Sequence, residues 1–269
     1  MPPTDALRSL APTLRCPHCA GSLRLAGNTL ACAHRHSFDV ARQGYVNLLT
    51  RAAPANADTP EMVRARAAFL NAGHYLPIAR AVAAAVGDAE RVLETGAGTG
   101  YYLAQVLDAR PGATGLATDV SPAAARIAAR AHPRLASVVA DTWAGVPVAD
   151  EVFDALLCVF APRNPAEFSR VLRPGGALAV VVPTATHLAG LRDDYGLLGV
   201  PSDKAAAVAR AFADWPSRVE RVEADLDLSA DEVARLIAMG PNAFHGVPES
   251  TAPAGTRLSV DVVRLTRPT

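Results

Sequence analysis

The chain has 269 residues, half of them apolar, and its 26 lysines and arginines balance 26 aspartates and glutamates. This length allows one substantial domain beyond a small module. Zero net charge argues against a surface coated with basic residues for nucleic acid, and no apolar run of about 18 residues is present to span a membrane. At the start of the chain, residues 1–5 lack the basic and apolar regions of a secretory signal.

Near the amino terminus lies a metal-ligand spacing, Cys-x2-Cys-x12-Cys-x3-His, formed by Cys16, Cys19, Cys32 and His36. A hairpin over 23–31 would bring the second pair back to the first. Four such ligands leave no open position for water, so the spacing predicts a structural zinc ion, Zn²⁺, that folds a small module. His18 and His34 are competing ligands, but Cys-x3-His fits a second knuckle better. Committing thiols to a metal suits a reducing, cytoplasmic location.

The first 51 residues carry six arginines against two aspartates. This local excess of positive charge is compatible with a phosphate-bearing partner, although an ordinary solvent-exposed surface explains it equally well. Short strands at 38–40 and 45–49 are expected to finish the small module, and 50–58 is expected to be a linker because it has no periodicity. Thr59-Pro60-Glu61 then predicts the start of a helix that ends near residue 71, and a second helix follows over 77–86.

From residue 91 onward, short apolar strands alternate with helices. The strands are expected at 91–95, 114–118, 137–140, 155–160 and 177–182. Such strands predict an α/β fold with a doubly wound, mostly parallel sheet covered on both faces. Towards the end, 219–228 looks extended, a capping box at Ser229 opens a helix, and 258–265 predicts a final strand, antiparallel at the sheet edge.

A glycine-rich loop separates the first of these strands from its helix. It reads Gly-x-Gly-x-Gly, with Thr99 between the last two glycines, and its glycines are Gly96, Gly98 and Gly100. Tyr101 occupies the position where the dinucleotide-binding fingerprint has glycine. Glu94, at the end of the strand, would repel a pyrophosphate but suits a cationic amino-acid ligand.

Two further acids follow the next strands. Asp119 can accept hydrogen bonds from both hydroxyls of a ribose, and Asp141 can hold an adenine amino group. Either acid alone could be a helix cap or a loop residue. Because the carboxyl ends of parallel strands open onto one crevice, the acids and the loop together predict a binding site for S-adenosylmethionine (S-adenosyl-L-methionine).

With these motifs the chain resembles the class I S-adenosylmethionine-dependent methyltransferases, which have a seven-stranded sheet. More narrowly, it resembles the bacterial 23S rRNA (guanine-N1)-methyltransferases of the RlmA/TlrB type, in the macrolide-resistance branch. The resemblance covers nearly the whole chain. Its motifs are CPHC and CAHRHSFDVARQGYVNLL within 16–49, RAAFLNAGHYLPI at 66–78, ETGAGTGYY at 94–102, VFAPRN at 159–164, LRPGGAL at 172–178 and PTATHLAGL at 183–191.

The resemblance implies a zinc-ribbon-like module, a 23S rRNA substrate and methyl transfer to guanine N1. It also implies that the cofactor is contacted by Tyr75, Thr99, Gly100 and His187. Without the resemblance, His74 and Tyr75 would be interpreted as a helix boundary with a hydrogen-bonded histidine, and His187 as the start of a helix. Asp141 and His187 are conceivable bases for removing the N1 proton, but no catalytic base is assigned.

The predicted domains are a zinc-binding RNA-recognition module over 1–50, a linker and helical segment over 51–88, and a methyltransferase domain over 89–269. A homodimer is also possible.

Two rival functions stay open. One is a small-molecule methyltransferase whose zinc module is structural or serves dimerisation, which the neutral charge favours slightly. The other is a non-catalytic RNA-binding or protein-binding module, against which the intact glycine loop and acids argue.

Overall fold

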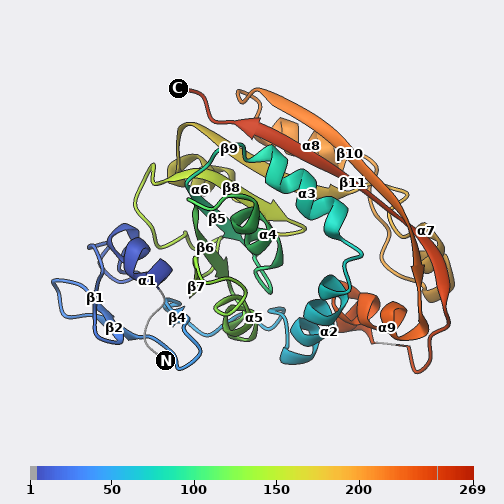
Figure 1. Ribbon diagram of the computed structural model, residues 1–269, viewed down its shortest axis with the longest axis horizontal. Coiled ribbons are helices and arrows are strands. Elements are labelled where there is room, and N and C mark those ends of the chain that lie inside the picture. The colour runs from blue at the N-terminus through green and yellow to red at the C-terminus, as the bar shows by residue number, and fades with distance from the viewer. Residues whose placement is uncertain (1–4, 247) are drawn as a thin grey trace.

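The computed structural model describes residues 5–246 and 248–269. The segment 1–4, part of the stretch in which no secretory signal is expected, lies outside them. Within this range an eight-stranded sheet has the order β10-β11-β9-β8-β5-β6-β7-β4 (Figure 1). Its strands are β4 Val46–Asn47, β5 Arg91–Thr95, β6 Thr114–Asp119, β7 Leu135–Val139, β8 Phe153–Val159, β9 Leu172–Pro183, β10 Ser217–Leu228 and β11 Ala254–Thr266. Pairing is parallel from β4 to β9, and β11 is antiparallel to both its neighbours. The predicted doubly wound, mostly parallel sheet is confirmed.

Two strands lie elsewhere than predicted. Val46 forms an antiparallel bridge with Val40 of the small module, as predicted, but Val46–Asn47 also pairs in parallel with Val138 and Val139 at the edge of the large sheet, which adds an eighth strand. Val46 and Leu48 are fully or nearly buried there, so apolar burial decides the pairing. The last strand is antiparallel as expected but is not at the edge, because β10 covers it. The side chains of β10 are mostly exposed, which is typical of an edge strand.

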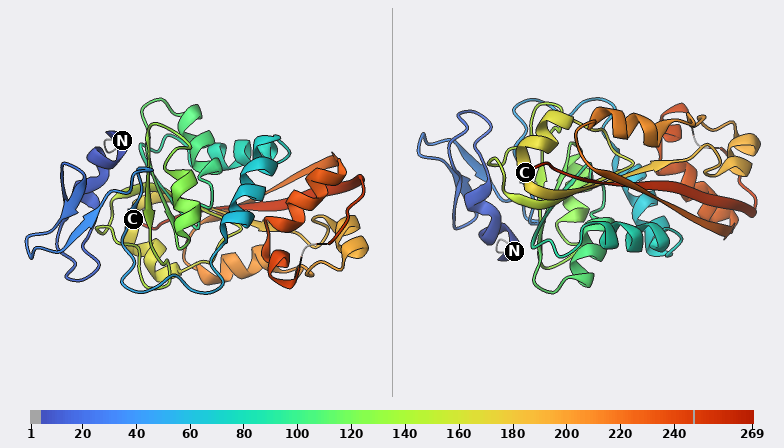
Figure 2. Two further views of the ribbon diagram at one scale, coloured as in Figure 1. Left: turned by 90° about the horizontal axis from the view of Figure 1, so that it is seen from below. Right: turned by 90° about the horizontal axis from the view of Figure 1, so that it is seen from above.

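Helices cover both faces of the sheet (Figure 2). One core contains side chains from α2 Pro60–Asn71, α3 Leu76–Ala85, α4 Tyr101–Ala109, α5 Pro122–Ala128, α7 Ala189–Tyr195 and α9 Ala230–Ala238. The opposite core contains side chains from α1 Asp5–Leu10, α6 Pro165–Val171 and α8 Lys204–Ala211. Within the described residues there are also two 3₁₀ helices, Ala11–Thr13 and Pro241–His245. In β8, Leu157 faces the first core and Cys158 the second, so Cys158 is a buried core residue.

Local capping residues set the helix starts. The Thr59 hydroxyl accepts from the Met62 N–H at 3.3 Å, with Pro60 as the first helical residue, so this predicted start is confirmed. Ser229 and Glu232 form the predicted capping box of α9. No sequence pattern predicted α1 or α8, whereas α7 begins two residues after His187, close to the helix start predicted there. Among the described residues, no helix combines the length and the apolar character needed to cross a membrane.

The zinc module is a three-stranded antiparallel sheet of β1 Arg24–Ala26, β2 Thr29–Ala31 and β3 Ser37–Asp39, so the predicted hairpin is confirmed. It occupies one end of the long axis, with β10, β11 and α9 towards the other (Figures 1 and 2). Leu23 and Leu30 are fully buried in the same core as α1 and one face of the large sheet. The Arg15 N–H also donates to the Pro147 carbonyl at 2.8 Å. The module therefore shares its core with the large domain.

Candidate metal centre and cofactor cavity

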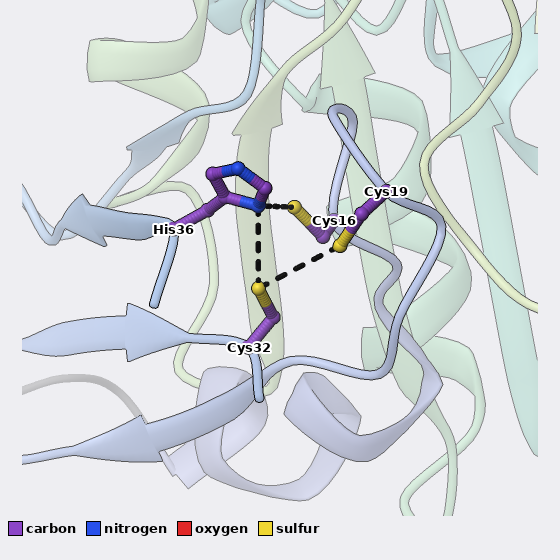
Figure 3. Close-up of side chains that lie close together, drawn as sticks. All are labelled: Cys16, Cys19, Cys32 and His36. Atoms are coloured by element: carbon purple, nitrogen blue, oxygen red, sulfur yellow. Dashed lines mark hydrogen bonds between the residues drawn. The ribbon is translucent and has the colours of Figure 1, made fainter. Parts of the chain in front are cut away.

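Four side chains of the zinc module converge beside its hairpin: Cys16, Cys19, Cys32 and His36 (Figure 3). Nδ1 of His36 lies 3.4 Å from the sulfurs of Cys16 and Cys32, and the sulfurs of Cys19 and Cys32 are 3.7 Å apart. A tetrahedron with Zn–S bonds of about 2.3 Å and a Zn–N bond of about 2.0 Å has edges of about 3.5–3.8 Å. These residues therefore fit a zinc ion bound by three thiolates and one imidazole.

Each pair of ligands sits on a tight backbone turn. The Ala20 N–H donates to the Cys16 carbonyl at 2.8 Å, and the Arg35 N–H donates to the Cys32 carbonyl at 3.0 Å. Ala20 and Arg35 have φ angles of 55° and 66°. The left-handed region is costly for residues with a Cβ, so both turns store strain that metal binding can offset.

The competing histidines lie outside the cluster. His18 and His34 are both exposed, and the ring of His18 stacks on Phe38 with centroids 5.9 Å apart. His36 is the histidine whose nitrogen reaches the sulfurs.

A second site is a cavity of about 500 Å³ at the carboxyl ends of β5, β6, β7 and β8. Its walls include most of the residues predicted to bind the cofactor, namely Tyr75, Glu94, Gly96, Gly98, Thr99, Asp119 and Asp141. Two predicted residues, Gly100 and His187, do not line it. Gly100, with φ 73°, starts α4 close to Ala128. The cavity is large enough for a cofactor.

The glycine loop is forced into close contact with the loop after β8. Gly96 has φ 63°, and a Cβ on this residue would lie only 2.5 Å from the Cβ of Ala161. A side chain at this position would therefore push the two loops apart, and glycine is required for both conformation and space.

Glu94 is the buried acid of the cavity, with 1% of its surface exposed. One carboxylate oxygen accepts from the Leu103 N–H at 3.1 Å. Burial, together with a smaller contribution from repulsion by Asp119, raises the pKa of Glu94 to about 8. A cationic ligand would compensate for both effects.

Asp119 and Asp141 are held by backbone N–H groups. Asp119 accepts from the N–H of Gly98 and of Ser121, each at 2.8 Å, and burial raises its pKa. Asp141 accepts from the Trp143 N–H at 2.9 Å and pairs with Arg51 at 3.2 Å. Carboxylate oxygens have further acceptor capacity, so both remain suited to cofactor hydroxyl and amino groups.

His187 stands behind Tyr75. Its Nδ1 accepts from the Ser259 N–H at 3.2 Å, which leaves the proton on Nε2, 3.5 Å from the Tyr75 hydroxyl. Burial lowers the pKa of His187 to about 4 and raises the pKa of Tyr75. His74 pairs with Glu232 at 2.8 Å, so the interpretation of it as a satisfied histidine is confirmed.

Arg66 is a residue of the site that the sequence pattern did not indicate. This side chain lines the cavity, is ion-paired with Asp58, and donates to the Met239 carbonyl at 2.6 Å. A Cβ on Gly98 would lie 3.0 Å from its Nη1, so the guanidinium lies against the glycine loop. Local pattern gave no signal for this role, because the contact joins residues far apart in the sequence.

The cavity fits S-adenosylmethionine chemically. At the glycine loop, the Glu94 carboxyl group and the Arg66 guanidinium are placed to bind an amino acid's ammonium and carboxylate, with Glu94 ionising when the cation binds. Asp119 and Asp141 offer acceptors at the ends of β6 and β7, where a nucleoside would bind.

Comparisons with known proteins agree with this geometry. A family model described as "RlmA, N-terminal", a zinc ribbon, matches residues 14–53, and a "Methyltransferase domain" model matches 92–176. The YcgJ protein of Bacillus subtilis has the same fold, with TM-score 0.51, 16% identity, and coverage of 73% of this chain and 100% of its own. A Haloferax volcanii methyltransferase complex aligns with TM-score 0.53 and 18% identity over 77% and 94% of the two chains.

The fold is thus that of an S-adenosylmethionine-dependent methyltransferase, and the cavity suits that cofactor. The 23S rRNA (guanine(748)-N(1))-methyltransferase of Streptomyces fradiae is 48% identical, over 89% of this chain and 88% of the relative. A Micromonospora griseorubida relative that carries the general name of 23S rRNA (guanine-N(1)-)-methyltransferase is 47% identical, over 96% and 94%. The chain belongs to the family of 23S rRNA (guanine-N1)-methyltransferases.

Proposed function

We propose that this protein transfers the methyl group of S-adenosylmethionine to N1 of a guanine in a stem-loop of 23S rRNA. The supporting observation is that a zinc ribbon and a cofactor cavity are packed into one structure, in a chain 48% identical to an rRNA methyltransferase along most of both sequences. The proposed division is a zinc-binding RNA-recognition module over 1–50, a linker and helical segment over 51–88, and the methyltransferase domain over 89–269.

In this proposal the cofactor is held by the cavity residues named above and supplies an electrophilic methyl group on a sulfonium. The glycine loop approaches the methionine part, and Glu94 accepts from its ammonium while Arg66 faces its carboxylate. Asp119 binds the ribose and Asp141 the adenine. His187 fixes the hydroxyl of Tyr75 and acts on the cofactor through that residue. Methyl transfer is an in-line displacement, so alignment of the two reactants supplies much of the rate enhancement.

Guanine N1 carries a proton in the neutral base, and the attacking lone pair becomes available when that proton leaves. The guanine edge is inaccessible in a duplex, so the target must be unpaired or flipped out. Phe160, at the end of β8, lines the cavity with φ 53° and 42% of its surface exposed. A bulky residue in the left-handed region is strained, and such strain is common where a ligand is positioned. We propose that the segment 159–164 shapes the pocket for the base.

The zinc module is proposed to bind the RNA backbone. A groove of about 670 Å³ runs between the module and the large domain, and Arg15 and Arg51 line it. Guanidinium groups bind phosphate oxygens well. Zinc would have a structural role here, because three thiolates and one imidazole would fill all four of its coordination positions.

The test is to incubate the protein with tritiated S-adenosylmethionine and 23S rRNA fragments, then map the labelled base. Label at guanine N1 is expected. Cofactor binding without labelling of RNA would contradict the proposal and favour a small-molecule substrate, and failure to bind the cofactor would favour a non-catalytic protein.

Three further parts of the proposal concern the cell. The expected location is the cytoplasm, where the rRNA is found. A homodimer stays a prediction that light scattering at two protein concentrations would test. Macrolide resistance also stays a prediction, and drug susceptibility of a host expressing the wild type or the Asp119→Ala variant would test it.

A further inference from the structure

Trp143 is the most exposed large apolar side chain in the part of the chain that the structure describes, with 63% of its surface accessible. It lies on the wall of the cofactor cavity, two residues after Asp141. A tryptophan ring offers on the order of 150–250 Å² of surface for burial, so an exposed one at a cavity mouth is well suited to contact a ligand.

The exposure of Trp143 does not come from a loose loop. Its N–H donates to Oδ1 of Asp141 at 2.9 Å, and the Ala144 N–H donates to the Asp141 carbonyl at 3.1 Å. Nδ2 of Asn164 donates to the Thr142 carbonyl at 3.0 Å. Asn164 also caps α6, so this loop is fastened to the segment after β8 that carries Phe160. The backbone is fixed while the ring faces outward, which is how a preorganised contact surface is built.

Trp143 also lies where the cofactor cavity meets the groove beside the zinc module. The cofactor cavity and the groove beside the zinc module share Arg51, Ala140 and Asp141, and Ala144 lines the groove. The side chain of Arg51 is 72% exposed. An occupant that passes from the groove into the cavity would therefore meet guanidinium groups and the face of an indole. A nucleotide carries both matching parts, a phosphate and a flat base.

We propose that Trp143 is a stacking platform for an unpaired base of the RNA substrate, beside the guanine that enters the cavity. This inference rests on the proposed function. Stacking of a base on an aromatic side chain contributes about 1–3 kcal/mol, so Trp143→Ala is expected to weaken RNA binding roughly 5- to 140-fold. Trp143→Phe is expected to keep part of the affinity because it keeps an aromatic face.

The composition of the chain allows a direct measurement, because it contains two tryptophans. Trp215 is half-buried against Phe212, with ring centroids 5.0 Å apart, so Trp215→Phe leaves Trp143 as the single reporter. Its fluorescence is recorded during titration with S-adenosylhomocysteine, then with a 23S rRNA stem-loop, then with a fully paired duplex of equal length. Quenching is expected with the stem-loop and not with the duplex or the cofactor product alone. If Trp215→Phe fails to fold, the difference between wild type and Trp143→Phe gives the same signal.

The outcomes separate the two proposals. If the stem-loop binds and is methylated but leaves Trp143 fluorescence unchanged, stacking is wrong and the proposed function stands. If Trp143→Ala weakens S-adenosylhomocysteine binding and leaves RNA binding unchanged, the ring covers the cofactor and the inference fails. If the wild type binds no RNA, both fail. Val219→Ala is the control, since Val219 is 49% exposed on the edge strand away from the cavity.

Discussion

The hydroxyl of Tyr75 lies 3.5 Å from Nε2 of His187, and Tyr75 is the member of this pair that reaches the cofactor cavity. Tyr75 lies at the start of α3 and His187 in the loop after β9, so the two residues come from distant parts of the chain. Because His187 is also held by the Ser259 N–H, the two side chains form one rigid unit behind the cavity wall.

This pairing predicts that the two residues act together on the cofactor. Tyr75→Phe and His187→Ala should each weaken S-adenosylhomocysteine binding by about 1 kcal/mol, the size of one hydrogen bond, and the double variant should lose little more than either single one. Calorimetric titration of all four proteins measures this. Additive losses would show that His187 acts on the cofactor independently, and Tyr45→Phe in the tail of the zinc module is a matched control.

Cofactor binding should depend on the protonation of Glu94. Its pKa is about 8 in the folded protein and 4.5 in an unfolded chain, so the folded state holds more protons and stability falls as the pH rises from about 4.5 to 8. A cationic cofactor favours the carboxylate, so affinity should rise from pH 6.5 to 8.5 in wild type and stay flat in Glu94→Gln. Thermal unfolding should show the variant gaining stability relative to wild type over the same range. Equal pH profiles would contradict the assignment.

The metal centre should hold one zinc ion per chain. Cys32→Ser should lose it and lower the free energy of unfolding by on the order of 3 kcal/mol or more, with unfolding of the large domain affected because the two share a core. Elemental analysis and urea unfolding measure both effects. Cys158→Ala, at the remaining cysteine, should keep the zinc, as should His18→Asn and His34→Asn. Loss of zinc in either histidine variant would contradict the assignment of His36 as the histidine ligand.

Gly96→Ala should disrupt the cofactor cavity. The residue has φ 63° and its Cβ would meet Ala161 at 2.5 Å, whereas Gly27 has φ 58° with nothing within 4 Å. Both variants carry the left-handed cost of about 1–2 kcal/mol, and Gly96→Ala adds a clash. It should therefore lose more stability in urea and lose cofactor affinity, while Gly27→Ala keeps its affinity. Equal losses of stability in the two variants would show that the glycine loop and the loop after β8 can move apart at little cost.

Much of the fold follows from local sequence. The strand at 91–95, the glycine loop and the helix after it are consecutive, and Thr59-Pro60 and the Ser229 capping box mark helix starts through contacts within four residues. The spacing of the cysteines and His36 likewise encodes the metal cluster, because a short hairpin is enough to bring the pairs together.

Other features depend on which distant segments meet. The sequence alone did not indicate that Val46–Asn47 would extend the large sheet, that β10 would take its edge, or that Arg66 would lie against Gly98. It did not indicate that Trp143 would stay exposed, since an isolated tryptophan in a sequence is as compatible with a core. These outcomes are decided by burial and by long-range contacts, for which a linear pattern carries no signal. The sequence therefore determined the two chemistries, zinc binding and cofactor binding, and the tertiary structure decided how they are joined.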